Sequence, residues 1–344
     1  MYLMILTEKL KIQYPIIQAP MAGGITTPEL VSAVSNAGGL GSLGAGYMSA
    51  AEIKSAIHAI RELTNKPFAV NLFIPETHHA AENQIIKSCH NIEESCTELQ
   101  LKIIPAKKPY APSFEKQMNV LIEEKIPIFS FTFGLLDSAW INKLKKNNTI
   151  LIGTATNLAE AIALEKNGVD MIVAQGSEAG GHRSTFLGEA EDSLIHLSAL
   201  ISQIKNKINI PIIAAGGMMN RKNIAAMLAI GASSVQMGTA FLSCHESGAH
   251  PKYKEILLLQ TIDKTILTRA FSGKLARGIE NKFTNRMECK KENILDYPIQ
   301  NALTHSMRKM AKEKNNPDFM SLWAGQFAYL SKRMSVGELM RTEG

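Results

Sequence analysis

The stretch "TILIGTATNLAEAIALEKNGVDMIVAQG", residues 149–176, places two short apolar runs on either side of an alanine-rich segment. The two outer runs are continuously apolar, which is typical of parallel strands that are buried on both faces. The middle segment has the amphipathic pattern of a helix. A strand, a helix and a second strand in this order indicate a parallel sheet that is covered by helices.

The same alternation runs through the first two thirds of the chain. The helix expected after the first strand has Thr27 as its N-cap and Pro28 in its first turn, and it closes on Gly38. Eight strand candidates follow one another in this way, and that number favours a closed (β/α)₈ TIM barrel over an open sheet. The candidates are residues 14–20, 40–46, 68–73, 126–134, 149–156, 170–176, 210–217 and 233–241.

Two regions interrupt the alternation. The insert at residues 76–125 separates the third and fourth strands, and insertions at this end of a strand commonly shape or cover the active face of a barrel. The segment 245–316 is polar and helix-rich, so we expect a small helical subdomain that covers the substrate. The barrel is therefore assigned to residues 1–244 and is completed by a C-terminal helix at about 317–344.

Composition limits the classes of protein to which the chain can belong. The four cysteines have no paired spacing, which argues against a disulfide framework and favours the reducing cytoplasm. The first 17 residues have no basic start and no small-residue cleavage site, so we expect a lead-in segment and the first strand there. No apolar stretch is long enough to span a membrane. The net charge of +6 is scattered over helical segments, which favours a solvated basic surface over a nucleic-acid site.

Two groups of glycines have the spacing or position of a phosphate site, but only the second lies in a suitable structural context. "GLGSLG" (residues 39–44) has the spacing of a dinucleotide fingerprint, but it follows a helix and begins a strand, which is the wrong order. "AAGGM" (214–218) and "VQMGTAF" (235–241) instead lie at the ends of the seventh and eighth strands, where barrels commonly bind phosphate. Glycines there let backbone N–H groups approach phosphate oxygens closely. Tight turns remain the alternative explanation for these glycines.

"AQGSEAGGHRS" (residues 174–184) carries the candidate catalytic residue, His182. Residues just beyond a barrel strand face the reaction chamber, and an imidazole can exchange a proton near neutral pH. Gly180 and Gly181 would leave room for a ligand beside it. A looser group of histidines and cysteines in the insert matches no established zinc spacing, so a zinc site there is the less favoured alternative. Cys244 has no nearby base in the sequence and is expected to be structural.

The residues alone do not determine which phosphorylated ligand binds: a flavin, a pyridoxal phosphate and a sugar phosphate are all compatible with them. A Schiff-base enzyme needs a lysine at a strand end, and the strand candidates carry none, which counts against pyridoxal and aldolase chemistry.

Several further motifs, taken in order, resemble one family. "QAPMAGG", "SFTFG", "AQGSEAGGHR", "AAGGM", "VQMGTAF", "RAFSGKLARGIENKF" and "YPIQNALT" are similar to the nitronate monooxygenases, formerly called 2-nitropropane dioxygenases, and to their bacterial class I-like branch. The resemblance extends from Gln18 to about Gln326. It implies an FMN-dependent barrel that uses O₂ to oxidise alkyl nitronates, such as propionate 3-nitronate, to a carbonyl compound with nitrite or nitrate.

The resemblance also implies roles for individual residues. His182 should be the active-site histidine; it would orient the nitronate anion and could remove the α-proton of a neutral nitroalkane. The expected partners are a small-molecule nitronate and O₂, in a monomer or homodimer. Two rivals remain: an FMN-dependent NAD(P)H oxidoreductase of the enoyl-acyl-carrier-protein or quinone reductase type, and a flavin-binding protein without turnover. The residues expected to hold FMN are Ala19, Pro20, Met21, Asn71, Gln175, Gly180, Gly216, Gly217, Gln236, Met237, Gly238 and Thr239.

Overall fold

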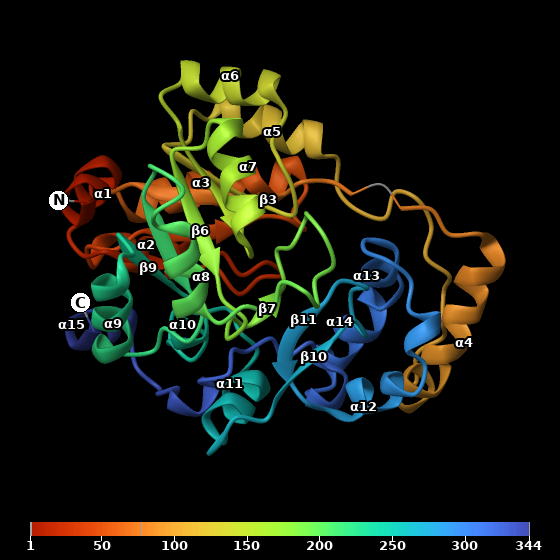
Figure 1. Cartoon of the computed structure of the whole chain (residues 1–344). Coiled ribbons are helices and arrows are strands. Elements are labelled where there is room, and N and C mark those ends of the chain that lie inside the picture. The colour runs from red at the N-terminus through yellow and green to blue at the C-terminus, as the bar shows by residue number, and fades with distance from the viewer. Residues whose placement is uncertain (1, 77, 344) are drawn as a thin grey trace.

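The computed structural model describes residues 2–76 and 78–343, and a barrel of eight parallel strands lies at its centre (Figure 1). The strands are β1 (Ile16–Gln18), β2 (Gly41–Gly44), β3 (Phe68–Phe73), β4 (Ile128–Thr132), β5 (Ile150–Ala155), β6 (Met171–Gln175), β8 (Ile212–Ala215) and β9 (Ser234–Met237). Their order is β1-β9-β8-β6-β5-β4-β3-β2. A parallel bridge between Ile17 and Leu40 brings the two ends of the sheet together. The predicted (β/α)₈ fold class is confirmed.

Amphipathic helices cover the outside of the barrel. The hydroxyl of Thr27 accepts a hydrogen bond from Leu30 N at 3.1 Å and Pro28 occupies the first turn, as the sequence predicts for α2 (Pro28–Asn36). The helices bury their apolar faces against the strands in one continuous core. The other helices of this layer are α3 (Ala50–Leu63), α5 (Phe114–Glu123), α6 (Ser138–Lys146), α7 (Leu158–Asn167), α8 (Leu197–Ile204) and α9 (Arg221–Ile230).

The N-terminal stretch holds a helix that the sequence did not lead us to expect. In α1 (Tyr2–Leu10), Leu6 and Leu10 are four residues apart and so lie on one face of the helix. Both side chains pack with inward-facing strand residues such as Ile17 and Ile128, in a core cluster inside the barrel. The helix therefore closes the end of the barrel opposite to the carboxyl ends of the strands.

The segment after the barrel contains the expected helices and, in addition, two strands. β10 (Thr265–Thr268) and β11 (Ala276–Ile279) pair antiparallel, and β11 pairs in turn with β7 (Gly181–His182) from the loop after β6. This small sheet joins the segment to the barrel at the candidate catalytic histidine. The helices of the segment are α11 (Pro251–Leu258), α12 (Lys282–Glu288), α13 (Ile299–Leu303) and α14 (His305–Glu313).

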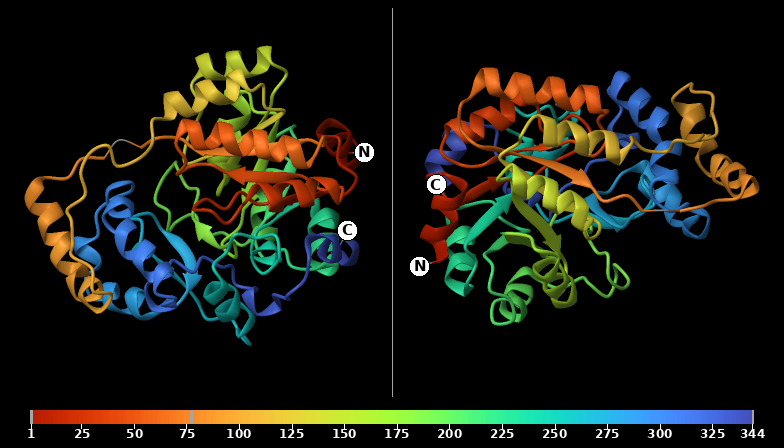
Figure 2. Two further views of the ribbon diagram at one scale, coloured as in Figure 1. Left: turned by 180° about the vertical axis from the view of Figure 1, so that it is seen from behind. Right: turned by 90° about the horizontal axis from the view of Figure 1, so that it is seen from above.

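Apart from α5, which belongs to the outer layer of the barrel, the insert at residues 76–125 does not cover the barrel. Its helix α4 (Glu82–Glu98) lies beside α12, on the side of the molecule away from the barrel (Figure 2). Cys89, Ile92 and Cys96 pack there against Phe283 and Met287 in a second core cluster. The insert therefore enlarges the subdomain, because its helix supplies part of that cluster.

The C-terminal end returns to the barrel, but its helix is shorter than expected. Only α15 (Val336–Glu343) is helical over several turns, and it packs against α2. The residues before it form short 3₁₀ turns at Pro317–Phe319 and Ala328–Leu330 and otherwise follow an irregular path. Within residues 2–76 and 78–343, no helix combines the length and the apolar character needed to cross a bilayer.

Candidate active site

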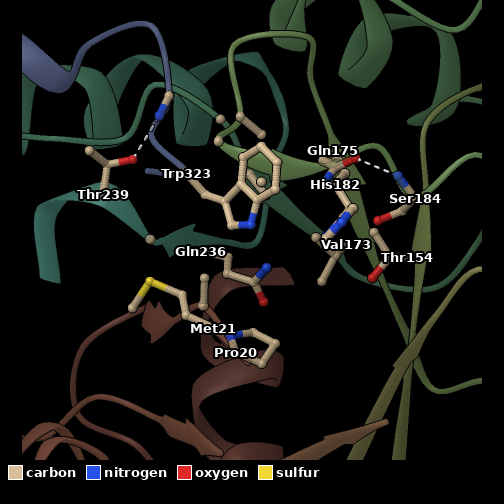
Figure 3. Close-up of a pocket in the computed structure, with 18 of the residues that line it drawn as sticks. Pro20, Met21, Thr154, Val173, Gln175, His182, Ser184, Gln236, Thr239 and Trp323 are labelled. Atoms are coloured by element: carbon tan, nitrogen blue, oxygen red, sulfur yellow. Dashed lines mark hydrogen bonds between the residues drawn. The ribbon is translucent and has the colours of Figure 1, made fainter. Parts of the chain in front are cut away.

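A large cavity opens at the carboxyl ends of the barrel strands, and it gathers nearly all of the predicted site residues. The space inside it measures about 1200 Å³ when the open region at its mouth is included. Figure 3 shows Pro20, Met21 and Gln236 on one side and His182 on the other. The predicted residues that line it are Ala19, Pro20, Met21, Asn71, Gln175, Gly180, His182, Gly216, Gly217, Gln236, Gly238 and Thr239.

Met237 is the predicted residue that the cavity does not include. Successive residues of a strand point alternately into and out of a barrel. Gln236 points inward, so the side chain of Met237 points outward, where it is 1% exposed in the core beneath the helices. Its carbonyl oxygen accepts a hydrogen bond from Ala19 N at 2.8 Å. Only the backbone of Met237 is therefore near the cavity.

The glycine turns after β8 and β9 present free hydrogen-bond donors. Among the described residues, the N–H groups of Gly216, Gly217 and Gly238 have no hydrogen-bond acceptor. Gly217 has a φ of +68°, and a side chain there would meet the ring of Phe327 at 2.6 Å. Gly238 has neither constraint: its φ is −107°, and an added Cβ would make an ordinary 3.5 Å contact with Ala19. A ligand that approaches the backbone closely accounts for a glycine at this position.

The two glycines before His182 have different explanations. A side chain at Gly180 would come within 2.5 Å of the backbone of Ala324 and Gly325, so close packing of protein against protein requires this glycine. Gly181 has a φ of +76° and open space around it. The contact at Gly180 shows that the C-terminal segment 323–327 packs directly against the loop after β6. A 3.0 Å hydrogen bond from Gly325 N to Thr239 Oγ1 holds this segment in place.

The amide side chains in the cavity are oriented by neighbouring residues. Asn71 Nδ2 donates to Ser130 Oγ at 2.9 Å, which leaves Oδ1 to accept from a ligand. Gln175 Nε2 donates to the carbonyl oxygen of His182 at 2.9 Å, and its Oε1 accepts from Ser184 N at 3.0 Å (Figure 3). Gln175 therefore holds the backbone on both sides of residue 183; its contact with FMN remains a prediction.

His182 reaches the cavity from β7, and the subdomain fixes its ring. The pairing of β7 with β11 places the turn at Ser272–Lys274 beside the imidazole, and His182 Nε2 lies 2.8 Å from Ser272 Oγ. Burial, together with the smaller effect of the positive charges of Lys274 and Arg308, lowers the pKa of His182 to about 3. The imidazole is therefore neutral at physiological pH.

Two cations, Lys274 and Arg308, lie near His182, although neither is among the residues that line the cavity. Lys274 pairs with Glu76, and its Nζ lies 4.5 Å from the centre of the Phe133 ring. The largely buried Arg308 hydrogen-bonds to Asn301 and Thr304, and within the described parts of the chain no carboxylate is close enough to pair with it. Buried charges are normally paired, so Arg308 makes the site attractive to an anion.

Sequence reasoning missed an aromatic wall around His182. The ring centroids of Trp323, Phe133 and Tyr297 lie 5.4, 6.1 and 6.5 Å from that of the imidazole. Phe133 has a φ of +76°, an uncommon value for a bulky residue, and this turn carries its ring into the cavity wall. The motifs "SFTFG" and "YPIQNALT" contain Phe133 and Tyr297, but no pattern in the sequence indicates that these aromatic residues meet at His182.

Nothing in the described residues forms a group of three or more metal-ligating side chains. In the insert, Cys89 and Cys96 are buried in the second core cluster, and His78 lies near the carboxylates of Glu76 and Asp296. Cys244 is fully buried, and burial raises the pKa of its thiol, as befits a structural residue.

Residues 4–342 match the family described as nitronate monooxygenase. A probable nitronate monooxygenase from Staphylococcus saprophyticus is 44% identical over 345 residues, which cover 97% of this chain and 94% of the relative. One from Staphylococcus aureus is 41% identical over 336 residues and covers 97% and 94%.

Solved structures agree with these relatives. A nitroalkane oxidase from Streptomyces ansochromogenes has a TM-score of 0.91 and 36% identity, and it covers 98% of this chain and 96% of its own. FabK from Thermotoga maritima has a TM-score of 0.77 and 30% identity, with 98% and 94% covered. The protein is an oxidoreductase, and the chain belongs to the nitronate monooxygenase family of flavin-dependent enzymes.

Proposed function

We propose that this protein oxidises alkyl nitronates, such as propionate 3-nitronate, with O₂ to a carbonyl compound and nitrite or nitrate, using bound FMN. The observation that carries the proposal is the neutral imidazole of His182 beside the cations of Lys274 and Arg308. An anion is attracted to such a site, and a nitronate is an anion whose oxidation needs no base.

The residues present fit a flavin mononucleotide. The free N–H groups of Gly216, Gly217 and Gly238 suit the terminal phosphate, since backbone donors without acceptors bind anions. Asn71 Oδ1 and the side chain of Gln236 would face the flavin ring from the barrel. FMN supplies the electron transfer from the substrate and the reaction with O₂.

The chain's own residues bind the anion and keep it in place. If His182 Nε2 donates its hydrogen to Ser272 Oγ, the serine hydroxyl donates to the carbonyl oxygen of Lys274 at 3.2 Å. His182 Nδ1 then carries a lone pair that can accept the α-proton of a neutral nitroalkane. Lys274 and Arg308 would hold the resulting negative charge, and the aromatic wall restricts the access of water.

Anaerobic mixing tests the proposal. We expect propionate 3-nitronate to bleach the flavin absorbance within seconds, while NADH and NADPH act slowly or not at all. In air, nitronate loss should be accompanied by oxygen uptake and nitrite release, and heating should release FMN rather than FAD. A colourless protein that cannot be reconstituted with FMN would contradict the cofactor.

The likeness to FabK supports a second candidate, an FMN-dependent NAD(P)H oxidoreductase. Residues 39–44 do not favour it, because the glycines run from the end of α2 into β2 and do not open a helix. Fast reduction by NADH without any response to nitronates would favour this candidate.

We further propose that the protein is cytoplasmic and that it is a monomer or a homodimer. We also propose that the chain divides into a barrel (1–244 with 317–344) and a subdomain that covers the substrate (245–316).

A further inference from the structure

The indole of Trp323 presents a hydrogen-bond donor to the cavity. Trp323 is half-buried and lines the cavity, and Figure 3 shows its indole nitrogen directed into the cavity, toward the side that carries Gln236. An indole N–H can only donate a hydrogen bond. Among the described residues this N–H has no acceptor, and the nitrogen is not enclosed by protein, so a ligand in the cavity can reach it.

The protein fixes the indole in this orientation before any ligand binds. The carbonyl oxygen of Trp323 accepts a hydrogen bond from the Tyr253 hydroxyl, and an antiparallel bridge joins Trp323 to Gly278 of β11. A side chain at Gly278 would come within 2.9 Å of the indole Cε3, so this glycine leaves the space that the ring fills. Phe271 packs edge-on against the ring, with centroids 5.6 Å apart and an angle of 88°. The donor therefore meets a ligand with little rearrangement.

The segment that carries Trp323 connects two parts of the cavity. At one end, the centroids of the Trp323 ring and the His182 imidazole lie 5.4 Å apart. Toward the other end, the ring of Phe327 lies 2.6 Å from the place of a Cβ added at Gly217, in the turn proposed to bind phosphate. Trp323 is thus at the histidine end of the segment, where the substrate is expected.

A nitro group at this end needs a donor that His182 does not provide. If Nε2–H is donated to Ser272 and Nδ1 accepts the α-proton, the imidazole has no N–H left for a substrate oxygen. Of the three aromatic side chains around His182, Phe133 has no polar atom, and Tyr297 is not among the residues that line the cavity. Trp323 is the third, and its N–H is open to the cavity.

We propose that Trp323 Nε1–H donates a hydrogen bond to an oxygen of the substrate's nitro or nitronate group, which makes Trp323 a substrate-binding residue. This inference rests on the proposed function. When His182 Nδ1 takes the α-proton of a nitroalkane, the electron pair of the C–H bond forms the C=N bond and negative charge moves onto the nitro oxygens. The hydrogen bond strengthens as this charge develops, because hydrogen bonds to ions are the stronger ones. Trp323 therefore stabilises the transition state more than the neutral substrate.

The first test observes the indole N–H itself. The chain has two tryptophans, so protein labelled with ¹⁵N-tryptophan gives two indole ¹H–¹⁵N signals, and Trp140→Phe assigns them. Trp140 lies in the outer helix α6 beside Lys143 and is the internal control. The probe is nitrate, a planar anion that carries oxygens like those of a nitronate and has no carbon to oxidise. When nitrate is added to the FMN-loaded protein, the Trp323 proton signal should move downfield until the site is saturated, while the Trp140 signal stays. Chloride at equal ionic strength should move neither.

The second test removes the donor and keeps the ring. Benzothienylalanine in place of Trp323 puts a sulfur where the N–H stood, and Trp140→Phe is the matched control. For the first variant we expect kcat for a neutral nitroalkane to fall by about ten- to a hundredfold with little change in KM. For propionate 3-nitronate, which is charged when it binds, KM should instead rise by about ten- to a hundredfold. FMN affinity and melting temperature should match the parent protein, and Trp140→Phe should keep the parent's rates.

Three outcomes would overturn the assignment, and they differ. If nitrate leaves the Trp323 signal in place and the benzothienylalanine variant keeps the parent's rates, the N–H does not bind the substrate, and the proposed function is unaffected. If FMN loading alone moves the Trp323 signal and nitrate adds nothing, the N–H serves the cofactor. If the parent neither binds nitrate nor responds to propionate 3-nitronate, the proposed function fails, and the inference fails with it.

Discussion

His182 Nε2 and Ser272 Oγ lie 2.8 Å apart, although 90 residues separate them in the chain. The barrel supplies the histidine through the loop after β6, and the subdomain supplies the serine through the turn before β11. The candidate active site is therefore assembled from both parts. The subdomain orients the imidazole and supplies the adjacent charges, so its role is larger than that of a cover.

Ser272→Ala should disturb the histidine without removing it. The variant leaves Nε2 without its partner, so the proton can move to Nδ1, and the Nδ1 lone pair that we propose as the proton acceptor is then lost part of the time. We expect turnover of neutral nitroalkanes to fall by about tenfold or more, and that of preformed nitronates to fall less. Long-range ¹H–¹⁵N spectra of the imidazole would report the tautomer. An unchanged spectrum and unchanged rates would show that Ser272 does not orient the ring.

His182→Asn should leave FMN bound while turnover falls by about 10²–10⁴-fold, since proton transfer and charge stabilisation contribute on that scale. The loss should be larger for neutral nitroalkanes than for nitronates, because only the former need a base. The test measures steady-state rates on both substrates, together with the flavin content of the purified variant. Equal rates for variant and parent on both substrates would mean that His182 is only structural.

The depressed pKa of His182 also predicts how stability changes with pH. In the unfolded chain the imidazole titrates near 6.5, whereas in the folded protein its pKa is about 3. As the pH falls below 6.5 the unfolded chain takes up a proton that the folded protein does not, so folding becomes less favourable. Between pH 6.5 and pH 5 the loss is at most about 2 kcal/mol, an upper value because the ring lines an open cavity.

Denaturant unfolding at pH 7 and pH 5 measures this effect. His182→Asn removes the titrating group, so the variant should lose less stability than the parent over that interval. A parent and a variant whose stabilities change by the same amount would mean that the pKa of His182 is not depressed in the folded protein.

Arg308→Met should weaken the binding of anionic substrates. Among the described residues the largely buried guanidinium has no carboxylate partner that would offset its attraction for a bound anion. We expect KM for propionate 3-nitronate to rise by about ten- to a hundredfold and that for an uncharged nitroalkane to change little. Lys309→Met is the matched control: this lysine lies next in α14 and is exposed beside Glu313. If both substitutions raise KM equally, Arg308 contributes only to the net charge of the protein and does not bind the substrate.

The barrel could be predicted from the sequence because its signals are local. Each strand and helix carries its own pattern, and His182 and the glycine turns lie at strand ends that a barrel brings to one face. Ser272, Arg308 and Trp323 could not be predicted in the same way. They reach the site because β11 pairs with a strand of only two residues, Gly181–His182, which has no pattern of its own. The helix α1 was missed for a related reason: only tertiary packing shows which face of a short apolar segment is buried.

Gly238→Ala tests the phosphate site directly. The backbone conformation accepts a side chain and the added Cβ would make only an ordinary contact with Ala19, so the fold should keep its stability. If a phosphate lies against this turn, the methyl group occupies space that the ligand needs, and FMN affinity should fall by about tenfold or more. Gly337→Ala in α15 is the matched control, because a Cβ there would lie 3.6 Å from Arg341 and 4.0 Å from Ser335, both ordinary contacts, and Gly337 does not line the cavity. Fluorescence titration of the flavin-free proteins with FMN measures both variants; equal affinities would place the phosphate elsewhere and leave Gly238 without a role in binding.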